Sequence, residues 1–143
     1  MFRRRLVGVA VDPARNLVLL IEDDDGMRAA LARVLSVAGF DVHHFASAEA
    51  FQDAVGTVPP PRAVCLVLDL RLPGISGLEL MQWMKAHAFG LPVVMMTAFD
   101  NATPHEQARQ AGAASCLLKP FAGQALLAAV RGAIEAGARA GAP

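Results

Sequence analysis

The chain has 143 residues, 55% of them apolar, and its 13 basic and 13 acidic side chains leave no net charge. This length predicts one domain with a full core, and the apolar content excludes a disordered chain. A zero net charge offers no electrostatic footprint for nucleic acid or acidic membranes, and no apolar run reaches the roughly 20 residues of a membrane helix. We therefore expect a domain with no direct contact to nucleic acid or membrane.

Residues 1–16 are predicted to be an N-terminal extension outside the domain. Their basic start resembles that of a signal peptide, but Asp12 interrupts the apolar stretch and no small-residue cleavage site follows. Cys65 and Cys116 stand within apolar, strand-like runs. Without a disulfide framework they predict buried thiols in a reducing compartment, so we expect a cytoplasmic protein.

The first elements in chain order are two strands and two helices. Residues 17–21 are a continuous apolar run, which predicts a buried strand. An amphipathic helix follows, and Gly39 stands where helices commonly end. Residues 41–45 alternate polar with apolar side chains, as an edge strand does, and Ser47 is a predicted N-cap for a helix to about Val55.

A second buried strand is predicted at residues 64–68, again from a continuous apolar run. The Leu-Pro-Gly turn after it leads to Ser76 and Glu79, the sequence signature of a capping box. The helix that starts there is expected to run to about Ala88 and to end at Gly90.

Three further elements complete the pattern. Residues 92–97 predict a fourth strand, and a threonine–proline pair at Thr103 predicts the start of a helix that Gly112 closes. Residues 115–118 predict a fifth strand, followed by an alanine-rich helix that ends near Ala136. Strand and helix thus alternate five times, which predicts an α/β domain with a parallel sheet covered by helices on both faces.

Chemically useful side chains stand where four of the five predicted strands end. They are Glu22 and Asp23, Asp69, Thr97 and Lys119. Right-handed crossovers bring all these strand ends to one edge of the sheet, where open α/β sheets build their sites. Two carboxylates about 5 Å apart repel by roughly 3 kcal/mol at an effective dielectric constant of about 20. Three in one cleft therefore need a cation or must take up protons.

The donor types at this edge indicate phosphoryl transfer. Hard carboxylate oxygens, with no histidine or cysteine at metal spacing nearby, favour Mg²⁺. A hydroxyl from Thr97 and an ammonium from Lys119 suit phosphoryl oxygens. The candidate nucleophile is a carboxylate, which would form an acyl phosphate. The histidines are expected at surface or edge positions, away from the site: His43, His44, His87 and His105.

Separated motifs along the chain resemble the receiver domain of two-component response regulators. They are Glu22-Asp23 with Arg28, Leu68-Asp69 with Leu72-Pro73 and Gly77, Thr97-Ala98, and Lys119-Pro120-Phe121. The resemblance implies a (βα)5 doubly wound sheet of flavodoxin-like order 2-1-3-4-5. We accordingly expect a receiver domain over residues 17–138, after the extension at 1–16 and before a C-terminal tail at 139–143.

The resemblance also implies a Mg²⁺ site. Its ligands would be Asp23, Asp69 and the main-chain carbonyl of Arg71, with Glu22 reaching the ion through water. Four acids stand in a row after the first strand, so the register of the acidic pair has two solutions. The spacing to the family's arginine favours Glu22 with Asp23 over the pair one residue later. The next two acids, at 24 and 25, are then expected to be solvated near the positive end of the first helix.

The remaining roles follow from the same resemblance. Asp69 would accept a phosphoryl group from a sensor histidine kinase or a phosphotransfer protein, and Thr97 and Lys119 would bind the phosphoryl oxygens. The bond before Pro120 would be cis. The signal would pass to a downstream effector protein through the face formed by the fourth strand, fourth helix and fifth strand. A homodimer through the fourth helix, fifth strand and fifth helix is a further expectation.

Two positions depart from the family pattern or vary within it. Cys116 stands three residues before the lysine, where the family usually has the aromatic that moves inward with the threonine during switching. Thr97 and Cys116 are therefore the expected switch residues, with a weakened response. Phe99 stands two residues after the threonine, where the family varies and water access to the acyl phosphate is influenced.

We expect a stand-alone phospho-accepting receiver domain, not an enzyme acting on a separate substrate. The last predicted helix ends a few residues before Pro143, which leaves no room for a DNA-binding domain. One alternative is a phosphorylation-independent interaction module with the receiver fold, suggested by Cys116. Another is an aspartyl-phosphate phosphohydrolase, but Arg71 stands where such enzymes carry a second aspartate.

Overall fold

Strands and helices alternate along the part of the chain that the computed structural model describes, residues 14–98 and 103–140. The elements in order are β1 (Leu17–Ile21), α1 (Asp25–Val37), β2 (Asp41–Phe45), α2 (Ala48–Val55), β3 (Ala63–Asp69), α3 (Gly77–Ala86), β4 (Val93–Ala98), α4 (Thr103–Gln110), β5 (Ser115–Lys119) and α5 (Gly123–Ala140). The strand bounds predicted from the sequence agree with the observed bounds to within one residue. The predictions for Phe99 and for most of the N-terminal extension lie outside the described residues.

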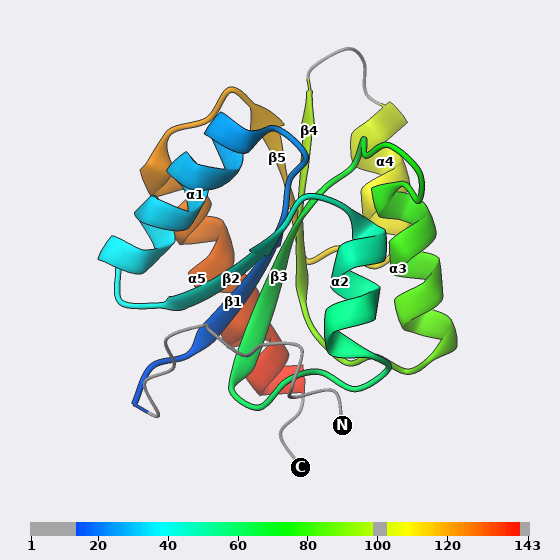
Figure 1. Cartoon of the computed structure of the whole chain (residues 1–143), viewed down its shortest axis with the longest axis horizontal. Coiled ribbons are helices and arrows are strands. Elements are labelled where there is room, and N and C mark those ends of the chain that lie inside the picture. The colour runs from blue at the N-terminus through cyan, green and yellow to red at the C-terminus, as the bar shows by residue number, and fades with distance from the viewer. Residues whose placement is uncertain (1–13, 99–102, 141–143) are drawn as a thin grey trace.

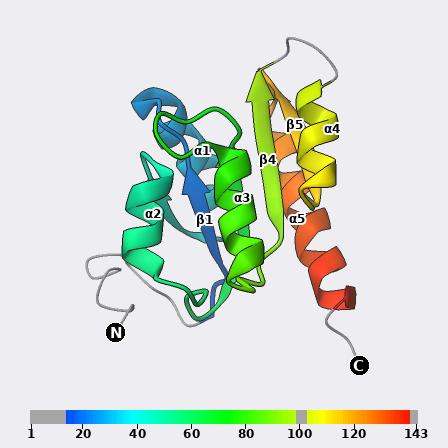
Figure 2. The ribbon, with the colours of Figure 1, turned by 90° about the vertical axis from the view of Figure 1, so that its right-hand side faces the viewer.

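The five strands form one parallel sheet in the order β2-β1-β3-β4-β5. Helices α1 and α5 cover one face, and α2, α3 and α4 cover the other (Figure 1). Figure 2 shows the face covered by α2, α3 and α4, with β1 and β4 visible between these helices. The doubly wound α/β fold and its strand order are confirmed, and parallel pairing brings the carboxyl ends of the strands to the same edge.

An apolar core lies on each face of the sheet. Successive residues of each central strand belong alternately to one core and to the other. In β1, Leu19 and Ile21 pack under α2 and α3, whereas Val18 and Leu20 pack under α1 and α5. Every residue of β1 is buried. A strand covered on both faces needs apolar side chains at every position, which explains the continuous apolar runs in the sequence.

Side-chain hydrogen bonds cap the N-termini of α2 and α3 at the positions that the sequence predicted. Ser47 caps α2 by accepting from the Ala50 amide, and Ser76 and Glu79 form the complete capping box of α3. Asp24 differs from the expectation of a merely solvated acid. Its carboxylate accepts from the Met27 amide at 2.7 Å and caps α1. An aspartate in front of a helical pattern is a strong N-cap signal.

The end of α3 differs from the prediction. The helix ends at Ala86, and Ala88 takes the left-handed conformation with φ of 51°, two residues before the expected Gly90. The amide of Phe89 donates to the Met84 carbonyl at 2.8 Å, which closes a Schellman motif. The physical reason is that the Phe89 ring is buried in the core, so the chain must turn one residue before it.

The length of α5, the burial of the cysteines and the packing of the methionines also bear on the predictions from the sequence. Helix α5 extends to Ala140, four residues beyond the predicted end near Ala136. Cys65 is buried as expected, but Cys116 is only half-buried. Met81 and Met84 pack in the core under α3, as helix-packing residues do. Within the described ranges, no helix is long and apolar enough to cross a membrane.

Candidate functional site

The site lies at the carboxyl edge of the sheet, where the central strands end. Glu22 and Asp23 follow β1, Asp69 is the last residue of β3, and Lys119 is the last residue of β5. The strand register pairs Ile21 with Leu68 and therefore places the ends of β1 and β3 side by side. The topology thus brings these four side chains together from three segments that are far apart in the sequence.

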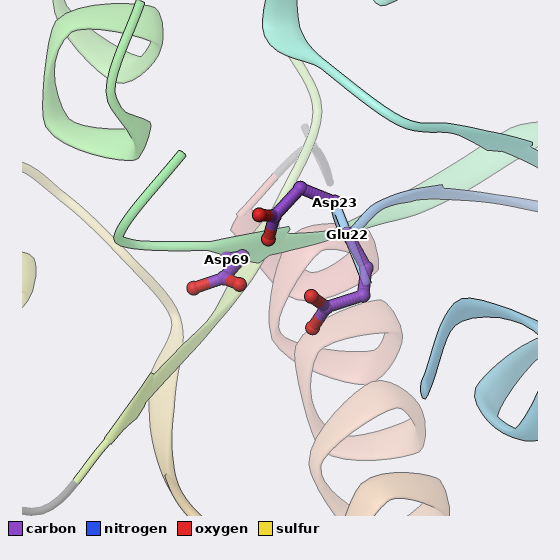
Figure 3. A group of neighbouring side chains, drawn as sticks. All are labelled: Glu22, Asp23 and Asp69. Atoms are coloured by element: carbon purple, nitrogen blue, oxygen red, sulfur yellow. The ribbon is translucent and has the colours of Figure 1, made fainter. Parts of the chain in front are cut away.

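Three carboxylates gather at this edge (Figure 3). Glu22, Asp23 and Asp69 each offer an oxygen atom, and these oxygens lie within 4.8 Å of one another. Glu22 and Asp69 are 1% and 5% exposed, whereas Asp23 is exposed. Hard oxygens in a group of this size fit a Mg²⁺ ion, which takes a few protein carboxylates and keeps several waters.

Lys119 bridges two of the carboxylates. Its Nζ atom donates to Glu22 Oε1 at 2.7 Å and to Asp69 Oδ2 at 3.0 Å. Desolvation, the largest single effect, lowers the pKa of Lys119, but the hydrogen bonds and charges of Glu22 and Asp69 together raise it above its ordinary value. Lys119 is therefore a cation at neutral pH, and it offsets part of the repulsion between the acids.

The backbone around Asp69 is held on both sides. Asp69 Oδ1 accepts from the Arg71 amide at 3.1 Å, and the Leu70 amide donates to the Met96 carbonyl of β4 at 2.8 Å. A Cβ atom added at Gly77 would lie 2.5 Å from the Asp69 carbonyl oxygen. Only a glycine can therefore start α3 this close to the end of β3.

Arg28 of α1 holds the main chain of the acidic segment. One guanidinium nitrogen donates to the Glu22 carbonyl at 2.9 Å, and another forms an ion pair with Asp25 at 2.6 Å. The second Glu22 oxygen accepts from the Asp24 amide at 3.1 Å. Glu22 and Asp23 are accordingly the pair beside Asp69, while Asp24 and Asp25 belong to the start of the helix.

The expected switch residues lie at β4 and β5. Thr97 is 1% exposed, and its hydroxyl donates to the Ala98 carbonyl at 3.2 Å. Cys116 borders a hollow of about 240 Å³ together with Ser115, Glu106 and Arg109. Burial raises the pKa of the Cys116 thiol. The roles predicted for Thr97 and Cys116, and for the Arg71 carbonyl as a metal ligand, stay predictions.

One contact at the site edge has no counterpart in the sequence analysis. Glu49, in the first turn of α2, accepts a hydrogen bond from the Ile75 amide at 3.0 Å. Ile75 belongs to the loop of residues 70–76 that leads from Asp69 into α3. The two residues are 26 positions apart, so neither helical nor strand periodicity signals the pair.

Together these features define a doubly wound α/β domain with an acidic cluster and a half-buried lysine at the carboxyl edge of its sheet. The chain belongs to the response regulator receiver domain family, whose sequence profile matches residues 18–131. A similar curated protein is the transcriptional regulatory protein FixJ of Azorhizobium caulinodans, 41% identical over 124 residues, with 87% of this chain and 57% of that protein covered. The receiver domain resemblance found in the motifs is thus confirmed.

Two further comparisons agree. The C4-dicarboxylate transport transcriptional regulatory protein DctD of Pseudomonas aeruginosa is 37% identical over 122 residues, which cover 85% of this chain and 26% of that protein. The solved structure of full-length FixJ from B. japonicum matches with a TM-score of 0.77 at 36% identity, covering 87% of this chain and 60% of that one. The chain spans about half the length of the FixJ-type curated relatives that it matches.

Proposed function

We propose that Asp69 is the phosphoacceptor of this receiver domain and takes its phosphoryl group from a sensor histidine kinase or a phosphotransfer protein. The observation that carries the proposal is a nearly buried carboxylate that faces Lys119 at 3.0 Å, with two further acids within 4.8 Å. Burying the like charges of Glu22 and Asp69 costs stability, and the single charge of Lys119 offsets only part of it. Such a cluster therefore serves the binding of a cation and a phosphoryl group.

The transfer step follows from the groups present. A carboxylate oxygen of Asp69 attacks the phosphorus of a phosphohistidine, the P–O bond forms as the P–N bond breaks, and the imidazole keeps the electron pair of the broken bond. Lys119 exchanges its contact with Asp69 for one with a phosphoryl oxygen. Thr97 is proposed to turn its hydroxyl from the Ala98 carbonyl toward another of these oxygens.

Glu22, Asp23, Asp69 and the Arg71 carbonyl would hold Mg²⁺. When bound, the ion supplies positive charge that offsets the charge of the phosphoryl oxygens. Glu22 already accepts two hydrogen bonds, from Lys119 and from the Asp24 amide, so its contact with the ion is proposed to run through water. Arg71 is the second residue of the loop between β3 and α3, and its amide donates to Asp69 Oδ1.

We propose that the output face includes β4, α4 and β5. Among the α4 side chains that the structure describes, Ala108 is buried and those at 106, 107, 109 and 110 are exposed, which indicates a small apolar contact with the sheet over these residues. Elements with little buried apolar surface move at low cost. A downstream effector, or a second copy of this chain meeting α4, β5 and α5, would read that change.

The two alternatives are less well supported. A phosphorylation-independent module would have no need for Lys119 to bridge two nearly buried acids. A phosphohydrolase would need an acid two residues after Asp69, and Arg71 stands there with its side chain exposed.

The test is the intact mass of the chain after incubation with acetyl phosphate and Mg²⁺. We expect one added phosphoryl group in the wild type and in Asp53→Asn, a surface control on α2, and none in Asp69→Asn or in excess EDTA. Equal modification of the wild type and Asp69→Asn would refute the assignment of the phosphoacceptor. Undiminished modification in EDTA would refute the requirement for the metal.

A further inference from the structure

The loop of residues 70–76 links the proposed phosphoacceptor, Asp69, to α3. Hydrogen bonds between residues close in sequence fix its two ends. The Arg71 amide donates to Asp69 Oδ1 at 3.1 Å, and the Gly77 amide donates to the Leu70 carbonyl at 2.9 Å. Near its end, the Ser76 amide donates to Glu79 Oε1 at 3.0 Å within the capping box. These contacts leave the middle of the loop, Gly74 and Ile75, to be placed by something else.

Glu49 of α2 supplies that contact from another element. Its Oε2 atom accepts from the Ile75 amide at 3.0 Å. The same oxygen lies so close to Gly74 that a Cβ atom added there would overlap it, and Gly74 also takes a positive φ of 75°. Two neighbouring residues of the loop are thus shaped around one carboxylate.

We propose that Glu49 is a positioning residue for the phosphorylation site. It holds the 70–76 loop so that the Arg71 carbonyl and the Asp69 carboxylate keep the positions from which they would hold Mg²⁺. Glu49 touches neither the metal nor the reacting atoms, and the inference rests on the proposed function of Asp69. Groups that orient metal ligands from outside commonly change metal affinity when they are removed.

Glu49 also favours the helix dipole of α2, and the experiment must distinguish this effect of its charge from the hydrogen bond to Ile75. Glu49 stands in the first turn of α2, where a carboxylate favours the helix dipole. Glu49→Gln removes the charge but keeps a side-chain oxygen that can accept from the Ile75 amide. Glu49→Ala removes both. If Mg²⁺ affinity falls in Glu49→Ala but not in Glu49→Gln, the lost hydrogen bond is the cause. If it falls equally in both variants, the lost charge is the cause.

The experiment measures Mg²⁺ affinity by calorimetry and backbone amide exchange by NMR in the full chain. For Glu49→Ala we expect faster exchange at Ile75 and Mg²⁺ binding weakened by about 3- to 10-fold, below the usual range for buried outer partners because this contact is exposed. Glu49→Gln should stay within about 2-fold of wild type. Gln52→Ala, on the same helix, is the matched control and should change neither readout.

A double-mutant cycle with Gly74→Ala gives the second test. The added Cβ must displace the Glu49 carboxylate, so its effect on Mg²⁺ affinity should be smaller in the Glu49→Ala background than in wild type. Additive effects would overturn the proposal, as would Glu49→Ala binding Mg²⁺ as tightly as wild type. If the wild type neither binds Mg²⁺ nor takes a phosphoryl group, the proposed function fails and this inference fails with it. If only Glu49→Ala is without effect, the proposed function stands.

Discussion

Lys119 Nζ lies 2.7 Å from Oε1 of Glu22, a carboxylate that is only 1% exposed. Removing the lysine would leave that charge buried and unpaired. We expect Lys119→Met to lower the free energy of unfolding by about 2–3 kcal/mol at pH 7, less than for a fully buried pair because Lys119 keeps some exposure. Urea denaturation measures this loss, and Lys85→Met on the exposed end of α3 is the control.

The same pair predicts a pH dependence. The folded state raises the pKa of Lys119 above its ordinary value of 10.5, so the ion pair's contribution is complete below about pH 10.5 and is lost as the pH rises through the higher folded value. The stability difference between wild type and Lys119→Met should therefore shrink in strongly alkaline buffer. A difference that stays constant there would show that lost packing, not the ion pair, causes it.

Asp23 is the exposed member of the acidic cluster, and its negative charge repels those of Asp69 and Glu22. Asp23→Asn should raise the melting temperature in EDTA by a few degrees at most, because exposed charges interact weakly. It should also abolish the increase that Mg²⁺ gives the wild type by mass action. Differential scanning calorimetry with and without Mg²⁺ measures both. A lower metal-free melting temperature in the variant would contradict the repulsion argument.

Gly77 allows α3 to start against the end of β3. A Cβ atom there would lie 2.5 Å from the Asp69 carbonyl oxygen and 2.8 Å from the Leu70 Cα atom, and neither backbone atom can move freely. We expect Gly77→Ala to cost about 2–3 kcal/mol and to slow phosphorylation of Asp69. Gly132→Ala, in α5 with open space around it, should instead stabilise the chain by about 0.5–1 kcal/mol.

Ala88 closes α3 in the left-handed region, whereas Gly39 closes α1 and has a φ of 108°. A side chain costs about 1–2 kcal/mol in that conformation. Ala88→Gly removes this cost, but glycine also raises the conformational entropy of the unfolded chain, which offsets part of the gain. We therefore expect Ala88→Gly to stabilise the chain by about 0.5–1 kcal/mol. Chemical denaturation is the measurement. Ala30→Gly, at an exposed position inside α1, should destabilise the chain by a similar amount.

Cys116 is small and borders a hollow of about 240 Å³, larger than the roughly 150 Å³ that holds a benzene ring. In the family picture an aromatic at this position moves inward during switching. We therefore expect a modest change in amide exchange over residues 97–121 with beryllofluoride and Mg²⁺, and a larger one in Cys116→Tyr. A large wild-type change that the substitution leaves unaltered would show that the missing aromatic does not weaken the switch.

The sequence by itself determined the features that short-range physics controls. Buried strands read as continuous apolar runs, because β1 and β3 are covered on both faces. The N-caps at Ser47 and Ser76 depend on an amide three residues away. The strand-end acids and Lys119 were recognisable because parallel topology sends the ends of all the strands to one edge.

Only the tertiary structure decided which of these groups meet and how. The Lys119 bridge joins residues 97 and 50 positions apart, and the Glu49–Ile75 bond joins two elements that no local pattern relates. The end of α3 was predicted two residues late because burial of Phe89 in the core, and not the nearest glycine, sets where the chain turns. Side-chain partners across a sheet depend on register and packing, which form only when distant segments come together.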